Sequence, residues 1–484
     1  MKKAIDVRVN VKPIFSNMVH SGIWEGPCRV GTKEELDPLY EIRTGKEQFK
    51  VWKKELLENI DSKYAKVLEP TYIEFDERFV VSDKELEKLK PDLQETDLYL
   101  ISYRVPGLSV MNKPVTMINK GPTPLDVIPL YIDLGLDAWF AHDYKEYNER
   151  LRLLQVQKAV ANTKWLILSA TEQITATGYA NPTDLFDLYK RYGIRNNRIT
   201  FRNIFDSMEK MEITPEIKQE AKKILNGATK STIKEEFVQG DIKFYNAVKE
   251  MMDLYDCNGF TISCKELCAS KFPAKHKITP CLTHSLFNGQ GIPSACEEDI
   301  GALLTMTFLT YLTCKSVYMG NSVLVSKNTK EVPQLGMPFL LFTPTMEFAD
   351  DVLEIHHAIP SLKMAGLDKP DLPYEVGHFT YEGFGSKLQV NLKDAAPEKI
   401  VTLARFNRHG DRVLIARAEV LGSEFKELYC SPESYFCVEG GVRSFRHRQA
   451  EGLYGNHLCL VYGDYIEDIK KLGKIAGFEV EHFC

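Results

Sequence analysis

The chain has 484 residues, of which 44% are hydrophobic and 26% are charged, and its formal net charge at pH 7 is −6. This composition is ordinary for a globular protein with several full-sized cores, and a mildly acidic chain gives no electrostatic reason to expect nucleic acid or a membrane as a partner. The longest apolar run, Gly301 to Cys314, is too short to cross a bilayer. Eleven cysteines without a repeated framework indicate a reducing compartment, so we expect a cytoplasmic protein.

The first third of the chain alternates runs typical of strands with runs typical of helices. The expected elements are the strands Ala4–Val11, Asp97–Val105, Val115–Asn119, Asp137–Ala141 and Trp165–Ser169 and the helices Lys46–Asn59 and Tyr144–Asn162. Strands separated by helices of this length predict a parallel sheet with right-handed crossovers. We therefore predict an N-terminal α/β domain over residues 1–168.

The middle third is richer in helix and carries an acid where a parallel sheet places ligands. Helices with exposed Lys and Glu are predicted at Thr183–Tyr192, Arg202–Met211, Pro215–Leu225 and Ile233–Tyr255. A strand follows at Phe260–Cys264, and Glu266 comes just after it. Ligands of open α/β sheets collect beyond the carboxyl ends of strands, so Glu266 is a candidate site residue. We predict a central α/β domain with an acidic site over residues 169–345.

The most informative stretch begins with three consecutive acids at residues 297–299, ahead of the apolar run Ile300–Leu312. Ser294 and Glu297 have the S-x-x-E spacing of a capping box, which predicts a helix that starts near Ala295. The apolar run has no polar face, so this helix should be buried on all sides. Acids at a helix start are favoured by the helix dipole. They can bind a cation, move protons, or serve only as caps.

The last third consists of short β-rich runs separated by turn residues. Strands are predicted at Phe339–Phe342, Val352–His356, Leu388–Leu392, Ile400–Phe406, Arg412–Val420 and His457–Tyr462. This pattern predicts an antiparallel β domain over residues 346–484. The expected fold class is therefore α/β, with two Rossmann-like (flavodoxin-like) domains followed by a C-terminal antiparallel β-barrel-like domain.

Three histidines lie at the ends of predicted strands. His356 and His357 end one strand, and such a pair can line a site or face solvent. His457 opens the last buried strand, where a lone histidine is more often a core residue than a ligand.

Several segments together resemble the L-fucose isomerase and L-arabinose isomerase superfamily. PSACEEDIGALLTMTFLTYLT, followed by a strand that ends YMGN, looks like the "ACEAD…GAL" segment of that superfamily. KIVTLARFNRHGDRVLIARAEV and GNHLCLVYGDYIEDIKKLGKIAGFEV are similar to its C-terminal domain, and LEIHHAIPSLKMAG resembles its histidine-containing segment. The likeness covers roughly the last 230 residues and is strongest to the fucose isomerase-like branch.

The resemblance implies a metal-dependent aldose–ketose isomerase that acts on an open-chain pentose or 6-deoxyhexose through a cis-enediol. In such an enzyme a divalent cation, usually Mn²⁺, is the Lewis acid and template, and a carboxylate moves a proton between adjacent carbons. By motif, Asp299 and His457 match the metal ligands of the family. Glu266 is the candidate for the other acidic ligand and, with Asp299, for catalysis. Glu297 and Glu298 are the alternates for that acid.

The resemblance also bears on the substrate contacts and the assembly. His356 and His357 are candidates for binding sugar hydroxyls. Family members form rings or stacked trimers, so a homo-oligomer, either a trimer or a hexamer, is expected. The alternatives to an isomerase are a non-catalytic or divergent sugar-binding paralogue and an epimerase on the same scaffold.

Overall fold

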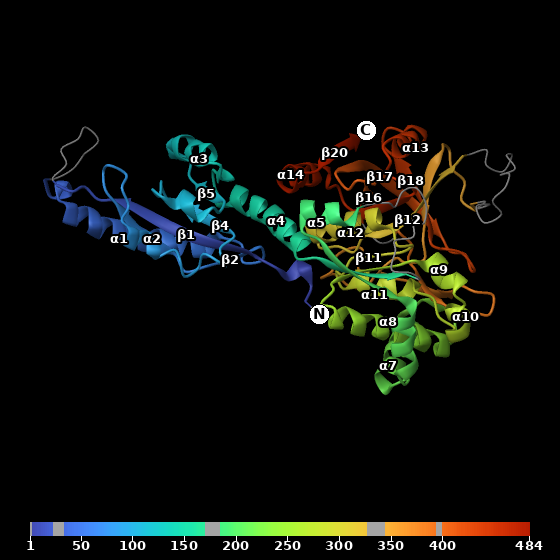
Figure 1. Ribbon diagram of the computed structural model, residues 1–484. Coiled ribbons are helices and arrows are strands. Elements are labelled where there is room, and N and C mark those ends of the chain that lie inside the picture. The colour runs from blue at the N-terminus through green and yellow to red at the C-terminus, as the bar shows by residue number, and fades with distance from the viewer. Residues whose placement is uncertain (1, 23–32, 170–183, 327–343, 394–398) are drawn as a thin grey trace. The chain divides into compact units, whose positions relative to one another are not determined.

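Figure 1 shows the computed structural model of the chain, which describes residues 2–22, 33–169, 184–326, 344–393 and 399–484. The chain divides into two compact units, Val7–Lys158 and Met1–Asp6 together with Ala159–Cys484. Across the described ranges, no helix combines the length and the apolar character needed to span a bilayer.

The unit Val7–Lys158 is built on one parallel sheet in the order β2-β1-β4-β5-β6, and β3 also pairs with β1. Its strands are β1 (Val9–Met18), β2 (Ala65–Val67), β3 (Thr71–Phe75), β4 (Leu98–Ile101), β5 (Val115–Ile118) and β6 (Ala138–Ala141). The helical segments are η2 (Lys33–Leu36), α1 (Pro38–Asn59), α2 (Asp83–Glu87), η3 (Leu108–Met111), α3 (Thr123–Asp133) and α4 (Tyr144–Ala161), the last of which crosses the boundary between the units.

Both faces of this sheet are covered, as the continuous apolar strands predict. Tyr99 and Ile101 of β4 belong to one buried cluster, and Leu98 and Leu100 of the same strand belong to another. Since successive side chains of a strand point to opposite faces, these are cores on the two faces of the sheet. The predicted parallel α/β architecture is confirmed for this part of the chain.

A second parallel sheet, in the order β11-β10-β7-β8, lies in the other unit. Its strands are β7 (Lys164–Ser169), β8 (Arg195–Thr200), β10 (Gly259–Ile262) and β11 (Ser294–Ala295). We expected β7 to complete the first α/β domain, and this was wrong, because β7 pairs with β8 and β10. A short buried apolar run has the same pattern in either sheet, so only its pairing partners decide where it belongs.

The C-terminal strands form a closed antiparallel barrel of six, because β16 pairs with β17 and completes the order β16-β19-β12-β13-β18-β17. The six strands are β12 (Tyr318–Val325), β13 (Val352–His356), β16 (Ile400–Phe406), β17 (Arg412–Glu424), β18 (Glu433–Val438) and β19 (His457–Tyr462). The predicted barrel is confirmed. Its strand β12 comes from within the range that we predicted for the central domain, so the barrel begins earlier in the sequence than residue 346.

The remaining elements of this unit lie outside the second parallel sheet and the barrel. They are η1 (Ala4–Asp6), α5 (Leu185–Tyr192), α6 (Phe201–Lys210), α7 (Pro215–Gly227), β9 (Lys230–Ser231), α8 (Glu235–Leu254), α9 (Cys264–Ala269), α10 (Phe272–His276), α11 (Cys281–Gly289), β14 (Glu375–His378), β15 (Ser386–Gln389), α13 (Val442–Glu451), α14 (Ile466–Ala476) and β20 (Glu479–Phe483). β15, β14 and β9 form a small separate sheet, and β20 pairs parallel with β17 outside the barrel. The predicted strand Phe339–Phe342 lies outside the described residues.

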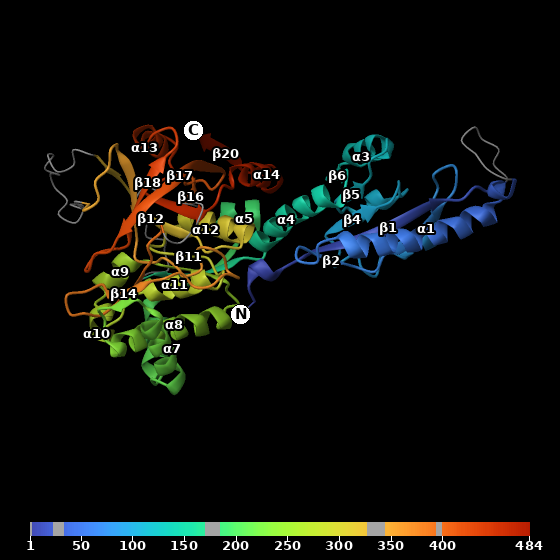
Figure 2. The same cartoon turned by 180° about the vertical axis from the view of Figure 1, so that it is seen from behind.

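Helix α12 (Ile300–Thr313) connects the parallel sheet to the barrel (Figure 2). It packs against β10 and β11 of the parallel sheet and against β16 and β19 of the barrel. Every residue from Ile300 to Leu312 is buried, which confirms the predicted all-round burial. The predicted start near Ala295 was wrong, because Ser294 and Ala295 form β11 and the helix begins at Ile300.

Close strand packing in the barrel gives a test of its register. A Cβ atom on Gly320 of β12 would lie 2.7 Å from the carbonyl oxygen of His356 and 2.7 Å from Cγ2 of Ile355. We expect Gly320→Ala to lower the free energy of unfolding by about 1–3 kcal/mol, because β12 and β13 must move apart. Denaturant unfolding followed by circular dichroism measures the change.

Gly240→Ala in α8 is the matched control. The added Cβ meets its nearest atom, Cγ2 of Ile278, at 3.4 Å, and alanine favours a helix interior over glycine. This variant should be as stable as the wild type or more stable. Equal losses in the two variants would contradict the packing of β12 against β13.

Candidate metal centre

The acidic turn between β11 and α12 cannot be part of a right-handed helix. Glu297 and Glu298 have φ angles of 59° and 54°, in the left-handed region that residues other than glycine rarely adopt. Asp299 is the N-cap of α12, and its carboxylate accepts the backbone N–H of Ala302 at 2.8 Å. The three acids therefore have separate environments although they are consecutive in sequence.

The carboxylate of Glu297 faces two imidazoles. Its Oε1 lies 3.7 Å from Nε2 of His357, and its Oε2 lies 3.8 Å from Nε2 of His457. One ligand atom from each of the three residues lies within 4.8 Å of the others. Ligand atoms about 2.0–2.2 Å from a first-row ion lie roughly 3–4 Å apart, so the spacing suits one ion. The side chains are 16%, 3% and 7% exposed for Glu297, His357 and His457, respectively.

The barrel register brings the two histidines together. His457 is the first residue of β19, and His357 directly follows β13. Asn321 of β12 pairs with His457 on one side and with His356 on the other. Residues that are far apart in the sequence thus meet at one position of the barrel wall, beside the start of α12.

Asp299 fixes the ring of His457. Its Oδ2 lies 2.8 Å from Nδ1 of His457, and its Oδ1 accepts Nη2 of the fully buried Arg405 at 2.8 Å. When the ring is neutral, a carboxylate at Nδ1 keeps the imidazole proton there and leaves the lone pair on Nε2, which faces Glu297. Asp299 and His457 are in direct contact, so Asp299 orients a potential ligand from behind.

His357 has a different set of partners. The backbone N–H of Ala358 donates to Nδ1 of His357 at 3.2 Å, and the backbone N–H of His357 donates to the hydroxyl of Tyr318 at 2.6 Å. An accepting Nδ1 places the proton of the neutral ring on Nε2. An ion at that atom would require the ring to release Ala358, whereas His457 already presents its lone pair.

The electrostatics keep the carboxylate of Glu297 ionised and one of the rings neutral. Burial opposes ionisation of Glu297, but His357, His457 and Lys265, whose Nζ lies 3.6 Å away, outweigh it and lower the pKa of Glu297 to about 2. Burial is the main reason that the pKa of His357 is lowered. Burial, with a smaller effect of His357, lowers the pKa of the neighbouring His284 to about 3.

The other residues expected at the site lie elsewhere or have other partners. Glu266 is half-buried in α9 and is not part of the Glu297 group. Glu298 is fully buried, with Oε1 3.7 Å from Nη2 of Arg198. Nδ1 of His356 lies 2.7 Å from Oε1 of the buried Glu354. Of the two histidines expected to bind sugar hydroxyls, only His357 belongs to the group.

Sequence reasoning missed three residues that shape the site, namely Arg405, Lys265 and His284. Arg405 had a signal, since it interrupts the apolar strand β16, where an arginine needs a buried anion. His284 also had one, because it lies in a helix whose other residues are mostly apolar or small. Lys265 had none, since a lysine that follows a strand is usually a solvated residue.

No protein-family model matches the chain, and no curated protein matches it either. Nε2 of His357 and Nε2 of His457 are both buried, and neither has a hydrogen-bond partner in the described part of the chain. Imidazole nitrogens and a carboxylate oxygen together can hold a metal ion. Glu297, His357 and His457 could hold such an ion.

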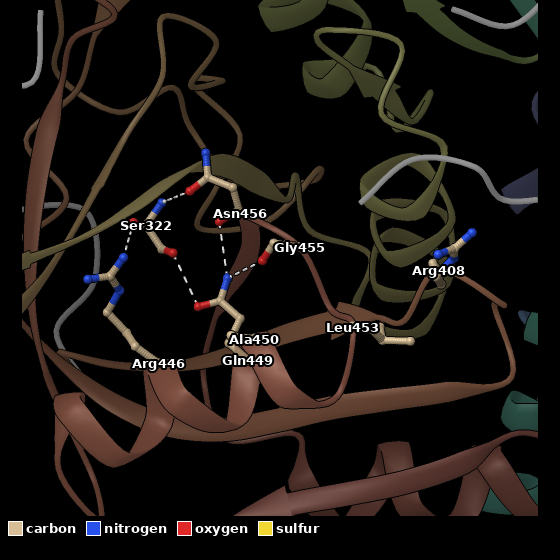
Figure 3. Close-up of a pocket in the computed structure, with 8 residues that line it drawn as sticks. All are labelled: Ser322, Arg408, Arg446, Gln449, Ala450, Leu453, Gly455 and Asn456. Carbon is tan, nitrogen blue, oxygen red and sulfur yellow. Dashed lines mark hydrogen bonds between the residues drawn. The ribbon is translucent and has the colours of Figure 1, made fainter. Parts of the chain in front are cut away.

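A separate pocket of about 310 Å³ lies beside α13 (Figure 3). Its lining residues are Ser322, Arg408, Arg446, Gln449, Ala450, Leu453, Gly455 and Asn456. None of them belongs to the Glu297 group. Arg408 and Arg446 lie at opposite ends of the residues drawn, so their guanidinium groups do not converge on one anion (Figure 3).

The contact between Asp299 and Arg405 can be tested through stability. Asp299→Asn leaves a buried guanidinium without its anion, so we expect the free energy of unfolding at pH 7 to fall by about 3 kcal/mol. Burial raises the pKa of Asp299, but Arg405 and His457 outweigh it and hold this pKa below the usual range of a carboxyl. The contact therefore stabilises the fold fully when the pH is above about 4, the pKa of an aspartate in the unfolded chain. This stabilisation is lost progressively as the pH falls from there toward the lower pKa of Asp299 in the folded chain.

The difference between Asp299→Asn and the wild type should accordingly shrink from pH 5 to pH 3 in denaturant titrations. Glu209→Gln is the control, because Glu209 is half-exposed and pairs with Lys275 at 2.8 Å. An exposed pair contributes less than about 1 kcal/mol. A loss in Asp299→Asn no larger than that of Glu209→Gln would remove Asp299 as a stabilising group.

Proposed function

We propose that the chain is a metal-dependent aldose–ketose isomerase that acts on an open-chain pentose or 6-deoxyhexose, with Mn²⁺ as its cofactor. The observation that carries the proposal is the largely buried Glu297 carboxylate, 16% exposed, which faces the Nε2 atoms of His357 and His457, both without a hydrogen-bond partner among the described residues. A metal-dependent sugar isomerase needs a site of this kind, because the protein must hold the cation while the sugar oxygens reach it from the other side.

The sequence resemblance to the L-fucose and L-arabinose isomerase superfamily supports the same conclusion. The segments that carry the resemblance are those that build the centre: the acidic turn with α12, the strand that ends at His356, and the strand that begins at His457. Two parallel sheets and an antiparallel barrel agree with the fold expected from it.

Within this proposal the residues have distinct roles. A bound cation would polarise the carbonyl of the open-chain sugar and favour negative charge on its oxygens. Glu297, His357 and His457 would hold the cation, with Asp299 keeping the proton of His457 on Nδ1. Lys265, with its Nζ 3.6 Å from Glu297, would keep this ligand carboxylate ionised.

Proton transfer between the first two carbons requires a carboxylate that can reach the substrate. Glu298 is fully buried beside Arg198, and Asp299 is held by Arg405 and His457. Glu266, in the helix that follows β10 at the same edge of the sheet, is half-buried, and we assign the base to it.

Metal binding is tested first. We expect the chelator-treated full chain to bind Mn²⁺ in isothermal titration calorimetry, and Glu297→Gln and His457→Ala to weaken binding by at least about 100-fold, because each removes one of few protein ligands. His447→Ala is the control, since His447 is an exposed histidine of α13. Wild-type affinity in Glu297→Gln would exclude this centre as the metal site.

Catalysis is tested with a panel of five-carbon and six-carbon aldoses in the presence of Mn²⁺, with the products identified by NMR. We expect ketose formation from at least one of them. Glu266→Gln should lower kcat by about 10²- to 10⁴-fold and leave Mn²⁺ affinity unchanged, as expected for loss of a general base. Glu212→Gln, at an exposed acid, should behave as the wild type.

The products separate the proposal from its alternatives. An epimeric aldose in place of a ketose would indicate an epimerase. Sugar binding without turnover would indicate a sugar-binding paralogue. Full activity in Glu266→Gln would move the base to another acid without affecting the metal site.

A further inference from the structure

Cysteines gather beside the acidic turn. Cys264 is the first residue of α9. A charge on its thiol would raise the pKa of four other cysteines, namely Cys268, Cys281, Cys296 and Cys430. One of these pairs is in contact, since Sγ of Cys296 lies 3.6 Å from Sγ of Cys264. All the described cysteines are free thiols.

The two contacting cysteines are sequence neighbours of residues at the candidate metal centre. Cys264 directly precedes Lys265, and Cys296 directly precedes Glu297, so each thiol is next in sequence to one partner of the Lys265–Glu297 ion pair. The two residues follow the parallel strands β10 and β11, which are neighbours in the sheet. Cys296 and Glu297 share a peptide bond, so a shift of the backbone at Cys296 moves Glu297 as well.

We propose that Cys264 and Cys296 are a modification site, where a reversible disulfide forms and withdraws Glu297 from the two imidazoles. The bond requires the sulfurs to approach from 3.6 Å to about 2.05 Å. Glu297 and Glu298 hold left-handed conformations with φ of 59° and 54°. Such residues persist only where their surroundings hold them, so this turn is the part of the chain that yields when Cys296 moves.

The oxidant is a low-molecular-weight disulfide such as oxidised glutathione. Cys264 is half-buried and can be reached from solvent, whereas Cys296 is buried. The thiolate of Cys264 attacks one sulfur of the oxidant, forming a mixed disulfide and releasing one thiol. The thiol of Cys296 then attacks Sγ of Cys264, and its proton passes to the sulfur of the second small thiol as that thiol leaves. Two protein thiols are oxidised by two electrons, and one small disulfide is reduced to two thiols.

The test uses the full chain, reduced and then incubated with oxidised glutathione. After free thiols are blocked with N-ethylmaleimide, peptide mass spectrometry should find a Cys264–Cys296 cross-link that dithiothreitol removes. Amide hydrogen exchange over residues 294–302 should rise at least tenfold in the oxidised protein. Mn²⁺ affinity should fall at least tenfold, and this last readout alone depends on the proposed metal site.

Two variants complete the test. Cys264→Ser should give no cross-link and keep both its exchange rate and its Mn²⁺ affinity in oxidised glutathione. Cys268→Ser, at an exposed cysteine of the same helix, should behave as the wild type. Absence of the cross-link while Cys268 becomes glutathionylated would overturn the proposal, and so would a cross-link that leaves exchange over residues 294–302 unchanged. If reduced protein binds no Mn²⁺, the proposed function fails, while the cross-link and exchange still decide this inference.

Discussion

The carboxylate of Asp299 is the constraint on which the rest of this centre depends. It is buried and accepts bonds from three parts of the chain: the first turn of α12, Arg405 of β16 and His457 of β19. A buried carboxylate without such partners would be protonated. Because Arg405 and His457 belong to the barrel, the ionised Asp299 joins the barrel to the turn that follows the parallel sheet. It sets the start of the helix and the proton position of the histidine together.

As a consequence, the three consecutive acids have different contacts. Asp299 binds Arg405 and His457, and Glu298 is buried beside Arg198. Glu297 alone faces the unpartnered imidazole nitrogens, and it can do so because the two left-handed residues turn the chain between β11 and α12. Two residues in the left-handed region thus lie directly beside the candidate metal centre, a conformation that persists only where the surroundings hold it. The contacting thiols of Cys264 and Cys296 adjoin the same turn.

The sequence predicted the class of the fold well and its divisions less well. Alternating apolar and helical runs correctly predicted parallel sheets, and the short β-rich runs correctly predicted the barrel. Strand β7 was assigned to the wrong sheet, and β12 was placed outside the barrel. The sequence of a buried strand does not show which strands it pairs with. The capping-box spacing at Ser294 gave a wrong helix start, because a stronger cap, Asp299, lies closer to the apolar run.

By itself the sequence determined that acids stand at the start of a buried helix and that a histidine opens a buried strand, because these depend on residues close along the chain. Only the tertiary structure decided that Glu297 faces His357 and His457, and that Asp299 meets Arg405. Those contacts depend on the register of the barrel and on a backbone turn with positive φ. Neither leaves a periodic pattern in the sequence, because each is fixed by packing between segments far apart along the chain, as in the contacts of Asp299 with Arg405 and His457, which are 106 and 158 residues away.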